Sequence, residues 1–248
     1  MQTISGGADN KTRDHALSTW THHPADSMYQ VFLLLSVALL MSSGVAHGQT
    51  DFQSALDIYK IDAESSDIRF FIYRAGMLAR FGHNHVISVG HFEGTVHLHP
   101  NVEQSSVELA IPVDRLIVDD PVLRREEGDA FSSEPSADDI DGTRANMLGK
   151  GLLNAEQYPI IRVKGRKGSS GQDLESVLNL SVEFLGRVIE LSIPVALRLK
   201  GDELEASGVF RLAHSQLGIT PFRVIMGVLH VADEMDVKYR VRAERIKN

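Results

Sequence analysis

The chain has 248 residues, a length typical of one or two domains, and its 43% hydrophobic and 23% charged residues are typical of a globular protein. Lys and Arg total 25 against 33 Asp and Glu, and the net charge of -8 argues against a surface that neutralises the phosphates of a nucleic acid. Cysteine is absent, which excludes disulfides, thiolate metal sites and cysteine nucleophiles.

The N-terminal part of the chain indicates export. An apolar run with one polar member begins at Val31, and the small residues after it include Ala46 and Gly48, which suit a cleavage site before Gln49. The run is shorter than the roughly 20 residues that span a bilayer as a helix. The mature protein is therefore expected in the periplasm or outside the cell. The expected segments are a polar extension over residues 1–27, which a mis-assigned start would explain, a signal peptide over residues 28–48, and one domain over residues 57–246.

From residue 57 onward, apolar and polar residues alternate in short segments separated by glycine, proline and charged residues. A period of two is typical of strands with one buried face. The clearest segment is 188–199, where every second residue from Ile189 to Leu199 is aliphatic, and a short link at Leu185 to Arg187 joins it to a strand over 178–184. The pattern predicts about eight or nine strands in all, among them a short strand over 57–61 and a separate strand with Ile68, Phe70 and Ile72 on one face.

Only one segment has a convincing helical pattern. It covers residues 143–153, where Ala145, Leu148 and Leu152 are spaced to face a sheet. Residues 119–142 before it are rich in acids and are expected to form a solvated loop or flap. Strands of this number without a βα crossover pattern favour an all-β fold, as a closed antiparallel barrel or a sandwich.

Five short motifs follow one another along the chain. They are Tyr59-Lys-Ile-Asp62 with Ser65-Ser-Asp-Ile-Arg-Phe70, Phe92-Glu-Gly-Thr-Val96, Asn154-Ala-Glu-Gln-Tyr-Pro-Ile-Ile161, the Leu178 to Leu199 hairpin, and Ser215-Gln-Leu-Gly-Ile219. In this order they resemble the YceI-like family over residues 57–246. The resemblance implies an eight-stranded, lipocalin-like antiparallel barrel that holds a polyisoprenoid chain, such as that of an isoprenoid quinone or a polyprenyl phosphate, in an apolar tunnel.

The chain departs from the family pattern in two places. His214 stands where the family often has arginine, and Gly82-His-Asn-His-Val-Ile87 carries paired histidines that many relatives lack. The first departure bears on the headgroup of the lipid. The second indicates a subgroup with additional chemistry.

An eight-stranded barrel is either filled by its own side chains or holds one small ligand. The expected inward set is largely Ile, Leu and Val, and aromatic residues make up only 6% of the chain. Such a wall suits a chain of isoprene units, which binds by burial of apolar surface, whereas a packed core is the alternative. The residues predicted to bind lipid are Phe70, Ile72, Phe92, Val96, Leu109, Ile111, Leu180, Val182, Leu191, Ile193, Phe210 and Tyr239.

His83 and His85 are two residues apart, so on a strand both rings would point to one side of a sheet. His214 is the candidate third partner from across the barrel mouth. The three are predicted to bind a lipid headgroup or Zn²⁺ at the rim of the barrel. A hydrogen-bonded turn between two strands is the structural alternative for His83 and His85.

The common catalytic signatures are missing from the sequence, which favours a lipid-binding protein over an enzyme. Two competing hypotheses stay open: a histidine-dependent metalloprotein or hydrolase-like enzyme on the same barrel, and a packed module that binds protein. The expected partner is a polyisoprenoid lipid, with transient membrane contact and no nucleic acid. A homodimer is left open.

Overall fold

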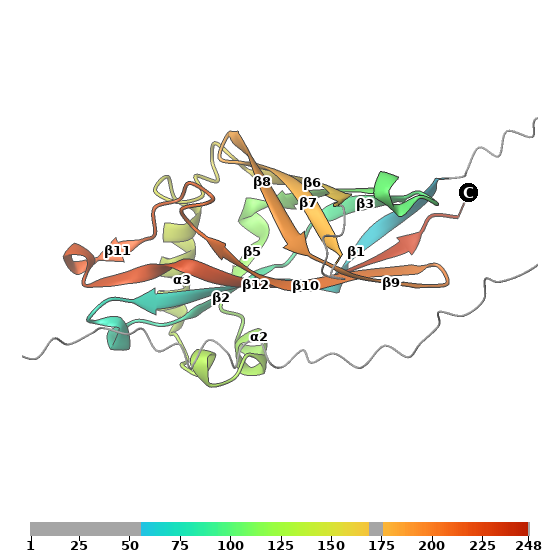
Figure 1. Cartoon of the computed structure of the whole chain (residues 1–248). Coiled ribbons are helices and arrows are strands. Elements are labelled where there is room, and N and C mark those ends of the chain that lie inside the picture. The colour runs from blue at the N-terminus through green and yellow to red at the C-terminus, as the bar shows by residue number, and fades with distance from the viewer. Residues whose placement is uncertain (1–55, 169–175, 248) are drawn as a thin grey trace, which may run out of the picture.

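The computed structural model describes residues 56–168 and 176–247, so the expected signal peptide and polar extension lie outside the described residues. Within these ranges the chain forms one sheet of twelve strands and two α-helices (Figure 1). The elements are β1 Asp57–Ala75, β2 His85–Val89, β3 Glu93–Leu98, β4 Ser106–Pro112, β5 Leu116–Val118, α2 Pro121–Glu126, α3 Ala137–Leu148, β6 Ile160–Lys167, β7 Val177–Phe184, β8 Arg187–Pro194, β9 Ala196–Lys200, β10 Glu203–Ala213, β11 Arg223–Val224 and β12 Leu229–Arg245.

Nine strands lie across the sheet in the order β8-β7-β6-β4-β3-β1-β12-β10-β9, and every pair along this path is antiparallel. The end strands β8 and β9 are separated in the chain by Val195 alone, so the sheet curls until its two edges approach each other. No ladder of hydrogen bonds joins these edges in the part of the chain that the structure describes. The all-β, lipocalin-like prediction is confirmed. The described sheet is a curled half-barrel with nine strands along its main path, and not the closed barrel of eight strands that the resemblance implies.

Two strand boundaries differ from the predicted ones. The segments predicted separately around Ile61 and Ile68 are both part of β1, which changes register between Asp62 and Asp67 opposite β12. Conversely, the continuous strand predicted over 188–199 is divided at Pro194 into β8, which pairs with β7, and β9, which pairs with β10. The break at Pro194 therefore lets the chain move from one edge of the sheet to the other.

The prediction of a solvated loop over residues 119–142 is wrong. It contains α2, a 3₁₀ turn at Asp129–Phe131 and the first half of α3. Asp120 accepts hydrogen bonds from the backbone N–H groups of Val122 and Leu123, with Pro121 as the first residue of α2. A capping box of Ser136 and Asp139 begins α3. These caps start helices despite the acidic composition, which is why the described residues contain two α-helices where one was predicted.

Helix α3 begins at Ala137 and ends at Leu148, earlier than the predicted range at both ends. Leu148 and Leu152 pack against the core of the sheet as expected, whereas Ala145 is exposed. The core lies on the concave side of the curled sheet, closed on one side by α3 and the residues after it. None of the described helices is long and apolar enough to cross a membrane.

Candidate functional site

The concave side of the sheet contains two adjoining cavities of about 320 and 270 Å³. We call the first the α3 chamber, because Thr143, Asn146 and Met147 of α3 line it, and the second the sheet chamber, because strands supply most of its wall. The two chambers lie side by side, with five residues bordering both, and together we call them the elongated space. The residues that line both are Phe70, Ile111, Ile161, Phe184 and Leu217.

The elongated space runs along β1 and β12. On β1, Ile72 lines the α3 chamber and Ile68 lines the sheet chamber. On β12, Met235 borders the α3 chamber, and the alternate residues from Val237 to Ala243 border the sheet chamber. Because side chains of a strand alternate between faces, these residues point to the concave side while their neighbours point to the convex side. The period of two therefore builds the apolar wall.

Eleven of the twelve residues predicted to bind lipid line this space. Ile72 borders the α3 chamber, Phe70 and Ile111 border both chambers, and the other eight border the sheet chamber. Phe92 borders neither; it lies just before β3 begins and is buried in the core cluster instead. The eight in the sheet chamber are Val96, Leu109, Leu180, Val182, Leu191, Ile193, Phe210 and Tyr239.

Polar side chains gather in the α3 chamber. His83, His85 and His214 line it, together with His230 and Arg74. His85 is the first residue of β2, whereas His83 precedes the strand. The premise that both lie on one strand is therefore wrong, although both residues line the same chamber. The structure thus brings all three predicted histidines to one end of the apolar space.

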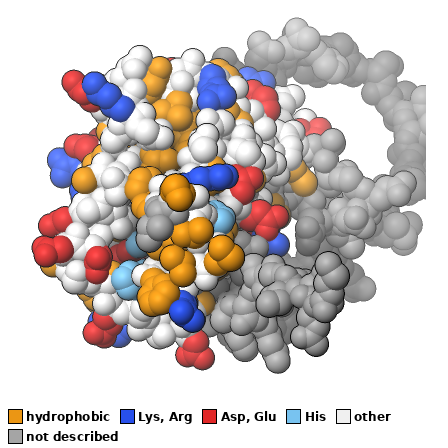
Figure 2. Space-filling model, turned by 90° about the vertical axis from the view of Figure 1, so that its left-hand side faces the viewer, with side chains coloured by type: hydrophobic (Ala, Val, Ile, Leu, Met, Phe, Trp, Pro, Cys, Tyr) orange, Lys and Arg blue, Asp and Glu red, His pale blue; other side chains and the backbone are white. Residues whose placement is uncertain are grey.

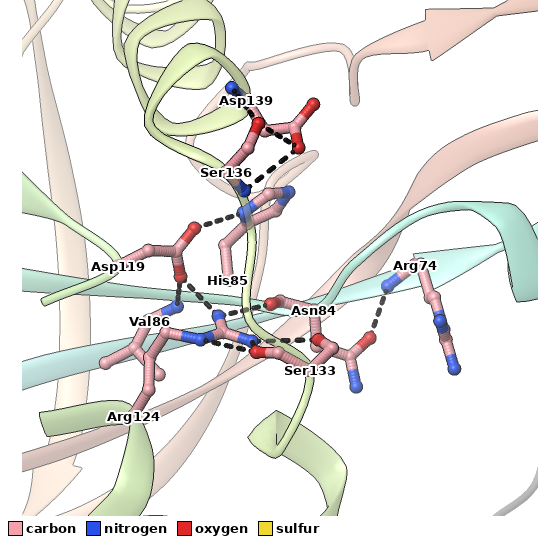
Figure 3. Close-up of polar contacts among 9 residues, drawn as sticks. All are labelled: Arg74, Asn84, His85, Val86, Asp119, Arg124, Ser133, Ser136 and Asp139. Atoms are coloured by element: carbon pink, nitrogen blue, oxygen red, sulfur yellow. Dashed lines mark hydrogen bonds and ion pairs between the residues drawn. The ribbon is translucent and has the colours of Figure 1, made fainter. Parts of the chain in front are cut away.

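His85 is held by a buried acid that sequence reasoning did not single out. Its Nδ1 lies 2.6 Å from Oδ2 of Asp119, which comes 34 residues later in the chain (Figure 3). Asp119 also accepts hydrogen bonds from the backbone N–H of Val86, at 2.9 Å, and from the guanidinium of Arg124. Burial raises the pKa of the Asp119 carboxyl, but the contacts with His85, Val86 and Arg124 outweigh burial and lower that pKa below its usual range.

Because Asp119 is ionised and accepts, Nδ1 of His85 is the donor in this contact. A neutral His85 then presents Nε2 as a hydrogen-bond acceptor, and a protonated ring presents it as a donor. The Asp119 carboxylate therefore determines whether Nε2 of His85 accepts or donates a hydrogen bond in each protonation state. A carbonyl oxygen of a ligand can only accept a hydrogen bond, so it cannot pair with Nε2 of neutral His85, which also accepts.

Asn84 ties the same segment to its surroundings. Its Oδ1 accepts from the backbone N–H of Arg74 at 3.0 Å, and its Nδ2 donates to the carbonyl of Ala130 at 2.9 Å. Its own carbonyl accepts from Arg124 at 2.7 Å (Figure 3). The segment Gly82 to Ile87 is thus fixed at Asn84, His85 and Val86, and His83 and His85 stand on the cavity side of this support.

The described residues contain no group of three or more His, Asp or Glu side chains placed to hold a metal ion. His214 and His230 each have Nδ1 next to a backbone carbonyl, that of Asp233 at 2.8 Å and that of Gly227 at 2.9 Å. The histidines share a chamber, yet they do not converge on one point. The prediction of a Zn²⁺ site at His83, His85 and His214 is therefore not supported by the geometry.

Comparison with known proteins gives a family and a fold. The family described as YceI-like domain matches residues 59–243. The crystal structure of BcnA from Burkholderia cenocepacia superposes with a TM-score of 0.53 at 16% identity, over 73% of this chain and 98% of that chain. A polyisoprenoid binding domain from Saccharophagus degradans, implicated in plant cell wall breakdown, gives 0.48 at 13% identity over 76% and 98%. No curated protein matches.

Proposed function

The chain belongs to the YceI-like family, and on that premise we propose that it binds a polyisoprenoid lipid, without catalysis, in the space along β1 and β12. The observation that carries this proposal is the elongated apolar space itself. A tail of isoprene units needs no hydrogen bonds, and its burial contributes roughly 25 cal/mol for each Å² removed from water. The lining residues of the sheet chamber, nearly all aliphatic or aromatic, supply a wall for such a tail.

The polar groups suggest how the lipid lies. We place the tail in the sheet chamber and the polar head in the α3 chamber, next to His83, His85 and His214. Neutral His85 accepts from a hydroxyl, as in a polyprenol or a quinol, and protonated His85 donates to a phosphate oxygen. The segment Gly82 to Ile87 then defines a subgroup that recognises the polar head of the lipid as well as its isoprenoid tail.

We also propose that the protein reaches its lipid after export, with cleavage near Gln49. The apolar run and the small residues after it support this proposal. N-terminal sequencing of protein recovered from the periplasm or the medium tests it. A recovered chain that begins upstream of residue 31 contradicts it.

Native mass spectrometry of the protein purified without detergent tests the cargo, followed by extraction and mass analysis of the lipid. We expect one polyisoprenoid lipid per chain. The double variant Val96→Trp with Leu180→Trp fills the sheet chamber and should lose the lipid. Glu183→Trp, which places the same ring on the exposed face of β7, is the matched control and should keep it.

Two outcomes would overturn the proposal. One is a folded double-tryptophan variant that keeps its full lipid load, because the tail would then lie elsewhere. The other is a wild-type protein that carries a metal ion or a straight-chain lipid in place of a polyisoprenoid. Circular dichroism on each variant separates loss of lipid from loss of fold.

A further inference from the structure

Two connections between strands meet at one end of the molecule. Residues 76–82 lie in the connection from β1 to β2, and residues 222–228 lead into β12; together we call these two segments the hairpin end (Figure 1, left). The N–H of Leu78 donates to the carbonyl of Val228 at 3.0 Å. Gly76 has a φ of 95°, and a Cβ at this position would collide with the Val228 carbonyl oxygen, so only glycine allows this close approach. The two connections are therefore held together as one surface.

The hairpin end exposes large apolar side chains. The exposed fractions are 84% for Met77, 65% for Phe81 and 102% for Met226, and Phe222 is also exposed. Met226 stands at the tip with a φ of 53°, a left-handed conformation that is costly for a residue with a side chain. Figure 2 views this end directly and shows an apolar patch in the middle of the face. Exposed apolar patches of this kind mark surfaces that contact a membrane or another protein.

The charge of this end is opposite to that of the whole chain. The net charge is -8, yet residues 68–92 and 206–232, which contain both connections, have no Asp or Glu. Arg74, Arg80 and Arg223 are exposed here. The guanidinium of Arg80 lies over the ring of Phe81, 4.7 Å from its centroid, so a cation and an exposed ring project together. Basic groups around an apolar patch complement a surface of anionic phospholipids.

We propose that the hairpin end docks on an anionic phospholipid bilayer, with Met77, Phe81 and Met226 in the interfacial region and the arginines at the phosphates. The α3 chamber begins next to this surface, since Phe222, Gly82 and Arg74 line it. Docking would place the chamber at the level where lipid heads lie. This inference goes beyond the proposed function, because it concerns the membrane contact and holds whatever lipid the cavity carries.

Vesicle flotation with the full mature chain tests the docking. The probes are vesicles of phosphatidylcholine mixed with phosphatidylglycerol, and vesicles of phosphatidylcholine alone. We expect binding to the anionic vesicles that weakens as salt is added. Met77→Ser with Met226→Ser, and Arg80→Gln with Arg223→Gln, should each reduce the affinity on the order of tenfold. The control Val122→Ser with Val188→Ser removes two exposed apolar side chains outside the hairpin end and should have no effect.

Equal binding by the control and both double variants would overturn the proposal, as would equal binding to neutral and anionic vesicles. Sedimentation velocity tests the alternative occupant, a second copy of the chain. Self-association that disappears in Met77→Ser with Met226→Ser, without any vesicle binding by the wild type, would assign the surface to a dimer and overturn docking. The lipid content of each variant is measured in parallel. Docking without any bound polyisoprenoid would defeat the proposed function alone, and a full lipid load without docking would defeat this inference alone.

Discussion

The middle parts of strands β1 and β12 are buried on both faces, but the two faces are buried in different ways. On the concave face, Phe70 and Ile72 of β1 border open space. On the convex face, the residues between and beside them, Arg69, Phe71 and Tyr73, are covered and in contact with partners. The same two strands thus separate a mainly apolar space from a layer of hydrogen bonds and ion pairs.

The convex layer is a network of buried charges beneath the segment that contains α2. Glu127, next to the end of α2, accepts from Arg69 and from Lys238, whose Nζ lies 2.8 and 2.9 Å from its two carboxylate oxygens. Burial lowers the pKa of Lys238, and the ion pair with Glu127 acts in the opposite direction. Nearby, Asp236 accepts from the hydroxyl of Tyr73 at 2.8 Å and from Arg211 at 2.9 Å.

The two faces of β1 and β12 have different roles: the convex face fixes the position of the strands, and the concave face borders the space for the lipid tail. Buried ion pairs and hydrogen bonds have strict geometry, so the convex layer holds β1, β12 and the α2 segment in one arrangement. The apolar side chains of the concave wall contact a ligand without directional hydrogen bonds, so a flexible tail can lie along the wall in many conformations. A cavity can stay open between strands when a second, polar layer holds those strands from outside.

The largest expected effect comes from breaking the convex layer. Glu127→Ala leaves Arg69 and Lys238 buried without their shared carboxylate, and should lower the free energy of unfolding by about 3–5 kcal/mol. Urea unfolding measures it. Glu183→Ala is the control, because its contact with Arg162 at 3.9 Å is exposed and should contribute less than about 1 kcal/mol. Similar losses for the two variants would contradict a special role for the convex layer.

A larger side chain should cost more stability on the convex face than on the concave face. Val86 is fully buried in the convex layer beside Phe71 and Phe131, so Val86→Phe should cost about 1–3 kcal/mol of stability through overpacking. Leu180→Phe adds a ring to a wall that borders open space, and should cost less than about 1 kcal/mol. Thermal unfolding of lipid-free protein compares the two. A larger loss for Leu180→Phe would mean that the concave space is closed in solution.

A third effect depends on pH and concerns the carboxylate beside the α3 chamber. The pKa of Asp119 is lowered in the folded state, so its ionised form contributes stability that is fully present above the usual pKa of about 3.8. This contribution is lost as the pH falls through the folded-state pKa. Asp119→Asn should cost on the order of 2 kcal/mol at neutral pH, and its difference from wild type should shrink below pH about 3.8. Urea unfolding as a function of pH measures the difference, and a constant gap across that range would argue against the assigned role.

Much of the concave wall could be predicted from the sequence, because the period of two in a strand is a local property. The alternation alone predicts that Leu191 and Ile193 line the concave wall. Phe92 lies before the first residue of β3, and it packs in the core and does not line the wall. The partnership of His85 with Asp119 spans 34 residues and exists only after the sheet forms, so no local signal points to it. The caps at Asp120-Pro121 and at Ser136 to Asp139 are local signals in the sequence, and they start helices in spite of the acidic residues around them.

The smallest expected effects on stability come from His83, which precedes β2, and His85, which begins it. His85→Ala removes the partner of buried Asp119 and should cost about 1–2 kcal/mol, whereas His83→Ala, before the strand, should change stability by less than about 0.5 kcal/mol. Both line the α3 chamber, so both should weaken binding of the lipid head. The measurement is the ratio of affinities for a polyprenyl phosphate and a polyprenol of equal length, since the common tail cancels. We expect His83→Ala to reduce this ratio several-fold at unchanged stability. An unchanged ratio in both variants would place the head away from the α3 chamber, and the histidines would then serve only to fix the start of β2.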